Sequence, residues 1–497
     1  MSRLIGSAGC FTAHMLNMRI GTRKEQTLAA VRPSHQIWAG AGFSSLQDLA
    51  VSVRPVQGAG GHHDPIANFR LHRVLLTVLV DHFVRQFSMT HRLGCGQGCC
   101  ARFLISSMQF TDQEVKGVVA PRFEPLGNAF ARTLATCHGH GAALHVRVDG
   151  EVVADLWGGS ASPDQLWQDN TPTVIFSCTK GLVSIMAGEL VREGLLDLDA
   201  PVSAYWPEFA RHGKGAMPVR WLFTHRAGLP AVRADLQLAD VVDWDRMVEI
   251  LADEEPLLQP GGVHQYHALT FGWLAGEIVR RISGMGVDEF FAERITEPLE
   301  VEAWIGAPDS ELSRVAQLYA DSEPPNPLPL APDVDPELAS LNERAMTLGS
   351  ALPADVAAGE VGFNDDELRR AVIPGAGGIA TAQAVATIWS ATVCDAEQIR
   401  LLNDDVIADM SQEQCAGQPA VPLPGPWARW GTGFMLSSEA RPFLTDASFG
   451  HDGLGGQVAF ADPQHKVGFA YLTNDLQRVD DRRGIVLVEV LRDLLRA

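Results

Sequence analysis

Two apolar runs separated by a polar pair are the first regular structure that the sequence predicts. The runs Ala142–Val148 and Glu151–Trp157 flank Asp149 and Gly150. Two residues of this kind between such runs are typical of a tight β-hairpin. A helical pattern around residues 121–138 comes before them. The body of the chain is therefore expected to begin with a helix and a hairpin.

Helical patterns dominate the middle of the chain, from about residue 180 to residue 400. A loop with six prolines between Pro324 and Pro336 interrupts them. Strand-like runs return near the end of the chain, and a closing helix is predicted after them. The segments with the clearest patterns are helices at 219–224, 270–282, 288–295 and 483–495, and strands at 448–451, 457–461 and 467–473.

This order of elements predicts an α+β fold. Strands from both ends of the body would form one antiparallel sheet with helices on its faces, and the middle would form an all-helical subdomain. We expect the sheet region to span about residues 108–176 and 430–497, and the helical region about 177–429. Side chains at the seam between the two regions would line a pocket.

Residues 1–107 differ from the rest of the chain in both pattern and charge. They show no sustained periodicity and carry a net charge of +7, whereas residues 108–497 carry −28. From Met108 onward the sequence has the composition and the hydrophobic patterns of an ordinary folded protein. We expect 1–107 to be a poorly structured extension, which a start site assigned too far upstream would also explain. A small accessory domain is the alternative.

The charge and the cysteine content of the chain limit its expected binding partners and its expected cellular compartment. The net charge of −28 on the body, within −21 for the whole chain, disfavours nucleic acid and anionic membranes as partners. Of the eight cysteines, the body has only four, which are widely scattered and form no disulfide framework, so a cytoplasmic location is expected. The apolar run at residues 74–80 is too short to cross a bilayer. The sequence does not indicate an oligomeric state.

The sequence predicts neither a metal nor an organic cofactor. Cys95, Cys99 and Cys100 lie close together, but no second Cys/His pair with zinc-like spacing follows them. The glycines of segment 138–141 lack the spacing and context of a phosphate-binding loop.

Ser177 and Lys180 form the most informative pair in the chain. They stand three residues apart at the predicted start of a helix, for which Gly194 is a plausible end. Residues at i and i+3 share a helix face, so the hydroxyl and the amine point into the same space. A serine hydroxyl is a weak nucleophile until a neighbouring base takes its proton. The pair alone is a weak signal, and two downstream motifs give it weight.

The first of these motifs contains Tyr266, one of only four tyrosines. It follows a Pro-Gly-Gly turn and precedes a predicted helix. A lysine ammonium beside its phenol would favour the ionised form, which could act as base and later as acid. A half-buried core tyrosine is the alternative. We expect His225 to be structural, while His264 and His267 would either line the pocket or be solvated.

The second motif is the glycine-rich segment 450–456 at the end of a predicted strand, which contains His451, Gly453 and Leu454. Glycine lets a substrate approach the strand backbone closely. Backbone N–H groups at this place could bind a developing oxyanion. His451 could donate to the substrate or hold Tyr266. A plain glycine turn with a solvated histidine is the alternative.

Together, in this order, the three motifs resemble those of the serine β-lactamase and penicillin-binding-protein superfamily, which are Ser-x-x-Lys, Tyr-x-Asn and Lys-Thr-Gly. The third motif is more similar to the His-x-Gly of family VIII carboxylesterases, which are of the class C β-lactamase type. The resemblance covers roughly residues 115–495 and includes segments 190–202, 222–230, 374–381, 430–434 and 468–474. It implies a β-lactamase/transpeptidase-like fold.

The resemblance also implies a role for each site residue. Ser177 would be the acylated nucleophile, and Lys180 would lower the barrier to its deprotonation. Tyr266 would act as base during acylation and as acid towards the leaving alcohol. The N–H groups of Ser177 and Leu454 would form the oxyanion hole, and His451 would take the place of the third-motif lysine, ahead of Gly453.

Two departures from the superfamily pattern favour esters over β-lactams. Ala268 stands where the second motif has asparagine, which contacts the amide side chain of β-lactams. His451 removes the fixed positive charge that pairs with the antibiotic carboxylate, because histidine is mostly neutral at pH 7. Both changes weaken recognition of β-lactams and spare the acyl-transfer chemistry.

We therefore expect a serine hydrolase that cleaves small, short-chain carboxylic esters through an acyl-enzyme on Ser177. A β-lactamase or a D-amino-acid peptidase or amidase of the same fold is the alternative, and acyl transfer to an alcohol is a third route. A protein of another class, a non-catalytic penicillin-binding-like protein, would keep the pocket without turnover. No Gly-x-Ser-x-Gly surrounds Ser177, as an α/β-hydrolase would require.

Overall fold

The computed structural model describes residues 114–320, 334–357, 362–477 and 481–497. The predictions for residues 1–107 and for the cysteines at 95–100 therefore lie outside the described residues, as does most of the proline-rich loop.

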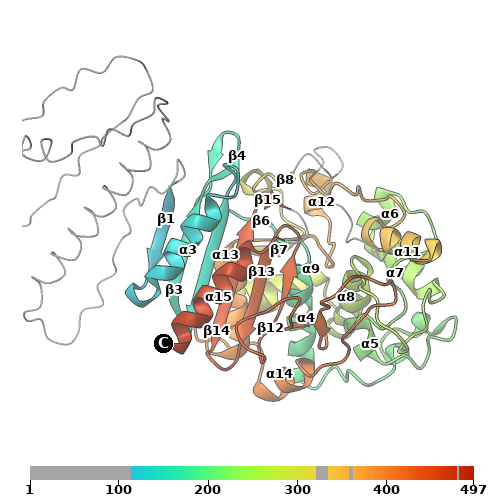
Figure 1. The fold of residues 1–497 in the computed structure, drawn as a ribbon. Helices are drawn as coiled ribbons and strands as arrows, with labels where there is room; N and C mark the ends of the chain where they lie inside the picture. Colours follow the sequence, from blue (N-terminus) through green and yellow to red (C-terminus); the bar gives the residue numbers. More distant parts are fainter. Residues whose placement is uncertain (1–113, 321–333, 358–361, 478–480) are drawn as a thin grey trace, which may run out of the picture. The chain divides into compact units, whose positions relative to one another are not determined.

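One antiparallel sheet joins the two ends of the described body, in the order β1-β3-β2-β14-β13-β12-β11-β10 (Figure 1). At its centre β14 pairs with β2 from Val467↔Val148 to Thr473↔Ala142, so strands more than 300 residues apart in sequence lie side by side. The predicted α+β architecture is confirmed. The strands are β1 (Val115–Val119), β2 (Ala142–Val148), β3 (Glu151–Gly158), β10 (Arg429–Trp430), β11 (Met435–Leu436), β12 (Phe449–Gly453), β13 (Gln457–Asp462) and β14 (Val467–Thr473).

The predicted hairpin between β2 and β3 is confirmed in register and turn. Val148 pairs with Glu151 across the two-residue connection. Asp149 and Gly150 have φ angles of +51° and +80°. Positive φ at both positions defines the type I′ geometry, whose twist matches that of the strands and which Asp-Gly adopts readily.

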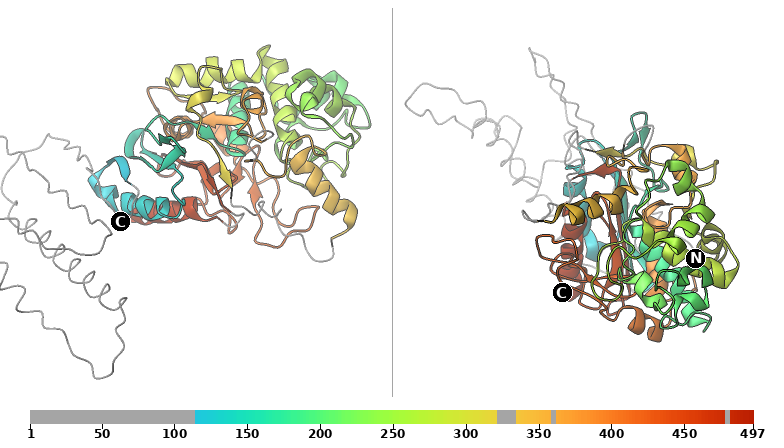
Figure 2. Two further views of the ribbon diagram at one scale, coloured as in Figure 1. Left: turned by 90° about the horizontal axis from the view of Figure 1, so that it is seen from above. Right: turned by 90° about the vertical axis from the view of Figure 1, so that its right-hand side faces the viewer.

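Helices cover both faces of the sheet. α3 (Glu124–Leu134) and α15 (Arg483–Arg496) pack side by side on one face, where Phe130, Leu487 and Leu491 are buried (Figures 1 and 2). α13 (Ala382–Val393) packs against β14 and β2 on the other face. Every residue of α13 except Gln383 is buried, because this helix lies between the sheet and the helical region.

The helical region includes α4 (Cys178–Arg192), which packs against α8 and β12 and so begins at the seam with the sheet. It also contains a three-stranded sheet in the order β6-β9-β7, whose strands of two or three residues are too short to give a periodic signal. Its other α-helices of five residues or more are α5 (Val219–Phe223), α6 (Leu238–Val242), α7 (Trp244–Asp253), α8 (Thr270–Ser283), α9 (Val287–Phe291), α11 (Pro336–Thr347), α12 (Asp366–Arg370) and α14 (Asp404–Met410).

Short elements complete the described chain. The small strands are β4 (Ser160–Ser162), β5 (Gln165–Leu166), β6 (Thr173–Val174), β7 (Ala303–Ile305), β8 (Tyr319–Ala320), β9 (Gly378–Ala380) and β15 (Asp475–Leu476). The short helical turns are Pro121–Phe123, Val202–Ala204, Pro207–Ala210, Ala292–Thr296, α10 (Glu297–Leu299) and Leu312–Arg314. None of the helices among the described residues has the length and apolar character that crossing a bilayer requires.

Candidate active site

Ser177 lies directly before the first residue of α4, where the sequence predicts the helix start. The chain turns sharply after β6, and Phe176 has a φ of +44°. Bulky residues rarely adopt this conformation, and strain of this kind often accompanies functional sites. The Phe176 carbonyl accepts the N–H of Thr179 at 2.9 Å, which closes the first turn. The hydroxyl of Ser177 is thereby presented at the seam between α4 and the sheet.

Lys180 is completely buried beneath Ser177 and its amine has three hydrogen-bond partners. Its Nζ lies 3.1 Å from Ser177 Oγ and donates to the carbonyl oxygens of Ala268 and Gly375, each at 2.6 Å. Three partners match the three donors of an ammonium group, so the position of Nζ is fixed. The predicted contact between the hydroxyl and the amine of the i, i+3 pair is confirmed.

Burial lowers the pKa of Lys180 to about 7, against the opposing effect of the nearby Asp452 carboxylate. The rings of Tyr266 and Phe271 face Nζ with their centroids at 4.9 and 5.9 Å. These aromatic faces favour the charged amine, but burial outweighs them. Near neutral pH a large fraction of Lys180 is therefore an uncharged amine, which can accept a proton from Ser177.

Tyr266 contacts the nucleophile from the opposite element, the loop that precedes α8. Its phenol donates to Ser177 Oγ at 2.8 Å. Its ring stacks on Trp430 with centroids 5.5 Å apart and an interplanar angle of 24°. His225 packs against the ring at 4.8 Å. The phenol is held between these rings and points at the hydroxyl, so the structure brings Ser177, Lys180 and Tyr266 into one cluster.

The predicted ionisation of Tyr266 is wrong. Burial raises the pKa of its phenol well above the ordinary value, and the charge of Asp452 adds to this effect. The lysine ammonium that was expected to favour the phenolate is itself partly deprotonated. Tyr266 therefore rests as a neutral phenol, which suits a proton donor better than a base.

His451 lies on β12 and is only 1% exposed, so it is not a solvated turn residue. Its Nδ1 is 2.7 Å from the carbonyl oxygen of Asp452 and donates to it. Burial, with the charge of Lys180, lowers the pKa of His451 to about 4. In this neutral tautomer Nε2 is an acceptor, and it is buried without a partner among the described residues.

The structure corrects the roles expected for His451. The ring does not hydrogen-bond to Tyr266, and the two ring centroids are 6.2 Å apart. Nor can Nε2 donate to a substrate while Nδ1 carries the proton. An incoming hydroxyl or N–H could instead donate to it.

Gly453 brings β12 against the start of α4. A Cβ at this position would lie 2.6 Å from the Ile175 carbonyl oxygen and 3.2 Å from Cys178 Sγ, so only glycine fits. The Cys178 thiol donates to the His451 carbonyl at 3.4 Å and ties the same two elements together. Cys178 therefore faces β12, behind the nucleophile.

Two backbone amides near this contact are available to a ligand. Within the described ranges, the N–H groups of Ser177 and Leu454 donate to no protein acceptor. Both residues are partly exposed. Unpaired amides at a helix start and a strand end are suited to binding the oxyanion of a tetrahedral intermediate.

The histidines around Tyr266 build the loop that carries it. His267 is fully buried, donates from Nδ1 to Gln265 O at 2.5 Å, and accepts the Leu229 N–H on Nε2 at 3.1 Å. His225 accepts the His267 N–H at 3.2 Å, in the structural role predicted for it. His267 neither lines the pocket nor meets solvent, because both ring nitrogens are used inside the loop.

Sequence reasoning missed three groups of this site. Trp430 supports the ring of Tyr266, the Gly375 carbonyl holds Lys180, and Arg441 pairs with Asp452. Trp430 and Gly375 lie in segments that resemble the superfamily, which is the signal that could have pointed to them. Arg441 lies in a loop without any pattern.

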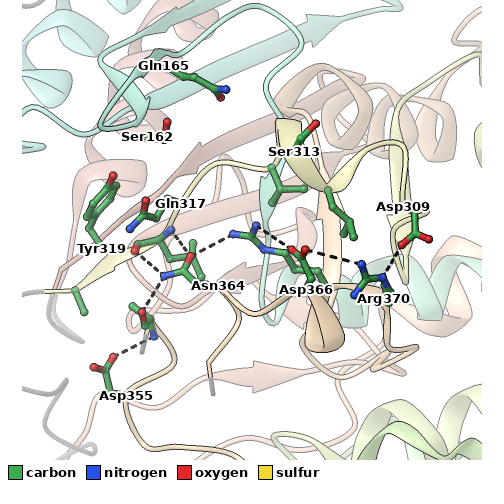
Figure 3. A pocket seen from close by; sticks show the side chains of 16 residues that line it. Ser162, Gln165, Asp309, Ser313, Gln317, Tyr319, Asp355, Asn364, Asp366 and Arg370 are labelled. Carbon is green, nitrogen blue, oxygen red and sulfur yellow. Dashed lines mark hydrogen bonds and ion pairs between the residues drawn. The ribbon is translucent and has the colours of Figure 1, made fainter. Parts of the chain in front are cut away.

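A cavity of about 860 Å³ lies elsewhere on the molecule (Figure 3). Ser162, Gln165, Tyr319 and Asn364 are among its lining residues, and Arg370 pairs with Asp309 at its edge. Ser177, Lys180 and Tyr266 are not part of its lining. In the described part of the chain, no group of three or more His, Cys, Asp or Glu side chains is arranged to hold a metal ion.

The sheet-and-helix fold and the Ser-x-x-Lys cluster together define the class of serine β-lactamases and penicillin-binding proteins. The chain belongs to the beta-lactamase family, whose sequence profile matches residues 126–491.

Three relatives show where in the family the chain lies. It is 33% identical to the esterase/beta-lactamase LipL of Mycobacterium tuberculosis, over 73% of this chain and 84% of LipL. It is 32% identical to a family VIII carboxylesterase of known structure, with a TM-score of 0.68 over 77% of this chain and all of the other. EstA of Arthrobacter nitroguajacolicus Rue61a is 33% identical with a TM-score of 0.67, over 76% of this chain and 98% of EstA.

Proposed function

We propose that the protein is a serine hydrolase that cleaves short-chain carboxylic esters through an acyl-enzyme on Ser177. One observation carries this proposal: Ser177 Oγ lies 3.1 Å from Lys180 Nζ and 2.8 Å from Tyr266 OH. A hydroxyl between a buried amine of lowered pKa and a neutral phenol has a proton acceptor on one side and a proton donor on the other.

Acylation would proceed through these three groups. The uncharged Lys180 amine takes the hydroxyl proton as Ser177 Oγ forms a bond to the ester carbonyl carbon. The N–H groups of Ser177 and Leu454 bind the resulting oxyanion. The C–O bond to the leaving alcohol then breaks, and Tyr266 gives that alkoxide its proton. A proton passes from the Lys180 ammonium to the phenolate and restores both groups.

Deacylation repeats the sequence with water. A water molecule in the place of the departed alcohol loses a proton to the pair Lys180 and Tyr266 and attacks the acyl carbon. Collapse of the second oxyanion releases the acid and returns the proton to Ser177.

Electrostatics supports neutral esters as the substrate class. His451 is uncharged near pH 7 because burial lowers its pKa to about 4. The Lys180 amine is enclosed by Ser177 and two carbonyl groups, so it is not available to a substrate carboxylate. The names of LipL, of the family VIII carboxylesterase and of EstA agree with ester hydrolysis.

We also propose that the hydrolase domain begins after residue 107 and that the protein works in the cytoplasm. Cys137, Cys178, Cys394 and Cys415 are all free thiols, which suits a reducing compartment.

The test is hydrolysis of p-nitrophenyl butyrate by the full chain, beside its Ser177→Ala variant. We expect turnover that falls by roughly 10⁴-fold or more in the variant. A chromogenic cephalosporin assayed in parallel tests the β-lactamase alternative, and we expect it to be the poorer substrate. Equal ester turnover by the wild type and S177A would contradict the proposal.

A further inference from the structure

Arg441 and Asp452 form an ion pair at the edge of the candidate site. Arg441 lies in the loop between β11 and β12, and its Nε donates to Asp452 Oδ2. The two side chains are 36% and 19% exposed. Ser438 accepts the Arg441 N–H on its hydroxyl at 3.1 Å and donates its own N–H to the Arg441 carbonyl at 3.0 Å. The arginine is thus held on a closed turn.

The carboxylate of this pair lies close to the reacting groups. Asp452 stands on β12 between His451 and Gly453, and its Oδ1 is 3.7 Å from His451 Nδ1. The strand is tied to the nucleophile helix by the Cys178 thiol. The charge of Asp452 raises the pKa of both Lys180 and Tyr266, so its field reaches the two groups that flank Ser177.

Among the described residues, Asp452 is the one carboxylate whose charge shifts the pKa of Lys180. The groups that face it from its own helix, from the loops after α5 and before α8, and from β12 are thiol, phenol and imidazole side chains. They are Cys178, His225, Tyr266, His267 and His451.

The arrangement leaves the site without a free cation among these groups. Lys180 is enclosed by its three acceptors, and His451 is neutral. Arg441 is positively charged, and its ion pair with Asp452 neutralises that charge. A substrate carboxylate would therefore find no unpaired positive charge among these groups, because Asp452 already occupies Arg441.

We propose that the Asp452–Arg441 ion pair is a specificity element, which makes the site accept uncharged esters and oppose esters that carry a carboxylate near the reacting carbonyl. This inference rests on the proposed function, because it concerns the same acylation step.

Two butyrate esters that differ in charge and by one methyl group test it: the butyryl esters of 4-hydroxybenzoate and of methyl 4-hydroxybenzoate. Both give the same butyryl-enzyme, so a difference in kcat/KM reports acylation alone. Their unequal intrinsic reactivity cancels when the ratio of the two kcat/KM values is compared between variants.

The two halves of the pair should have opposite effects. Asp452→Asn leaves Arg441 unpaired and should raise the anionic-to-neutral ratio about three- to tenfold, the size expected for one partly screened charge. Arg441→Gln leaves the carboxylate uncompensated and should lower the ratio. Asp149→Asn removes a similar ion pair with Lys466 on the exposed hairpin, at 2.9 Å, and should leave the ratio unchanged. Added salt should shrink both effects.

A second readout separates electrostatics from structural damage. The acid limb of kcat/KM against pH, where Lys180 titrates, should move to lower pH in D452N and to higher pH in R441Q. Loss of folding would lower the turnover of both esters. It would not move the kcat/KM ratio, or the acid limb, in opposite directions in D452N and R441Q.

The outcomes are distinct for the inference and for the proposed function. Turnover of the neutral ester with ratios that stay equal, or that move the same way in D452N and R441Q, overturns the inference alone. A folded wild-type protein that turns over neither ester overturns the proposed function, and the inference with it.

Discussion

Lys180 and Lys214 are two buried lysines in similar surroundings, and only Lys180 contacts the proposed nucleophile, Ser177. Their side chains are 0% and 1% exposed. Each amine lies over an aromatic ring, Lys180 at 4.9 Å from Tyr266 and Lys214 at 5.0 Å from Phe209. Burial lowers the pKa of both, to about 7 and about 8.

The difference between the two lysines is the identity of their partners. Lys214 Nζ donates to the carbonyl oxygens of Ala252, at 3.0 Å, and Glu254, at the end of α7. A cation there satisfies unpaired carbonyls and complements the helix dipole. Lys180 uses two donors in the same way but directs the third at Ser177. Burial and a lowered pKa therefore do not by themselves distinguish the proposed catalytic lysine, whereas contact with the proposed nucleophile does.

Replacing each lysine by methionine tests this distinction most directly. We expect Lys180→Met to lower kcat for p-nitrophenyl butyrate by about 10³- to 10⁴-fold, because it removes the proton acceptor. Lys214→Met should change kcat less than about twofold, yet destabilise the fold by about 1–3 kcal/mol, because two buried carbonyls lose their donor. Steady-state kinetics and urea unfolding measure the two effects. Similar losses of kcat in both variants would break the comparison.

Tyr266 should show the next largest effect. Removing its hydroxyl in Tyr266→Phe leaves the ring on Trp430 but takes away the proton for the leaving alkoxide, so kcat should fall by about 10²- to 10³-fold. Activated p-nitrophenyl esters need this proton less than alkyl esters do, so the loss should be larger for an alkyl butyrate. Tyr205→Phe is the matched control, since its hydroxyl accepts the Asp197 N–H at 2.9 Å, far from Ser177 in the chain. An equal loss for both esters would mean that Tyr266 is not the acid.

The sequence predicted one of these lysines and was silent on the other. Ser177 and Lys180 are visible because i, i+3 spacing on a helix brings their side chains together without knowledge of the tertiary fold. The Asp149-Gly150 hairpin is visible for a similar local reason. Lys214 contacts a helix end some 40 residues away, and no pattern along the chain marks such a contact.

The protonation states of the site also lay beyond the sequence. Tyr266 was expected to ionise beside an ammonium group, and His451 to donate a hydrogen bond. Desolvation decides both, since it raises the pKa of the phenol and lowers that of the imidazole. Burial is a property of the assembled fold, so residue type and spacing could place these groups but could not assign their protons.

The pH dependence of stability should separate the two lysines again. An unfolded lysine has a pKa near 10.5, so between the folded and unfolded values the unfolded chain binds more protons and the free energy of unfolding rises with pH. The advantage of the wild type over K180M should therefore grow from about pH 7 upward. Its advantage over K214M should grow only from about pH 8. Urea unfolding at pH 7, 8 and 9 measures both, and pH-independent differences would contradict the lowered pKa values.

Cys178 should give the smallest effect and refines the comparison. Like Lys214, it donates to a backbone carbonyl, but that carbonyl belongs to His451 on β12, the strand that leads to the proposed oxyanion amide of Leu454. Cys178→Ala should let β12 shift against α4 and lower kcat/KM by about three- to fivefold, the value of one modest hydrogen bond. Cys394→Ala is the control, since its thiol donates to Ser390 O on α13 at the same 3.4 Å. If both cysteine variants kept full activity, only residues that contact Ser177 directly would affect catalysis. If C178A alone lost activity, positioning of the strand that leads to the proposed oxyanion amide would count as well.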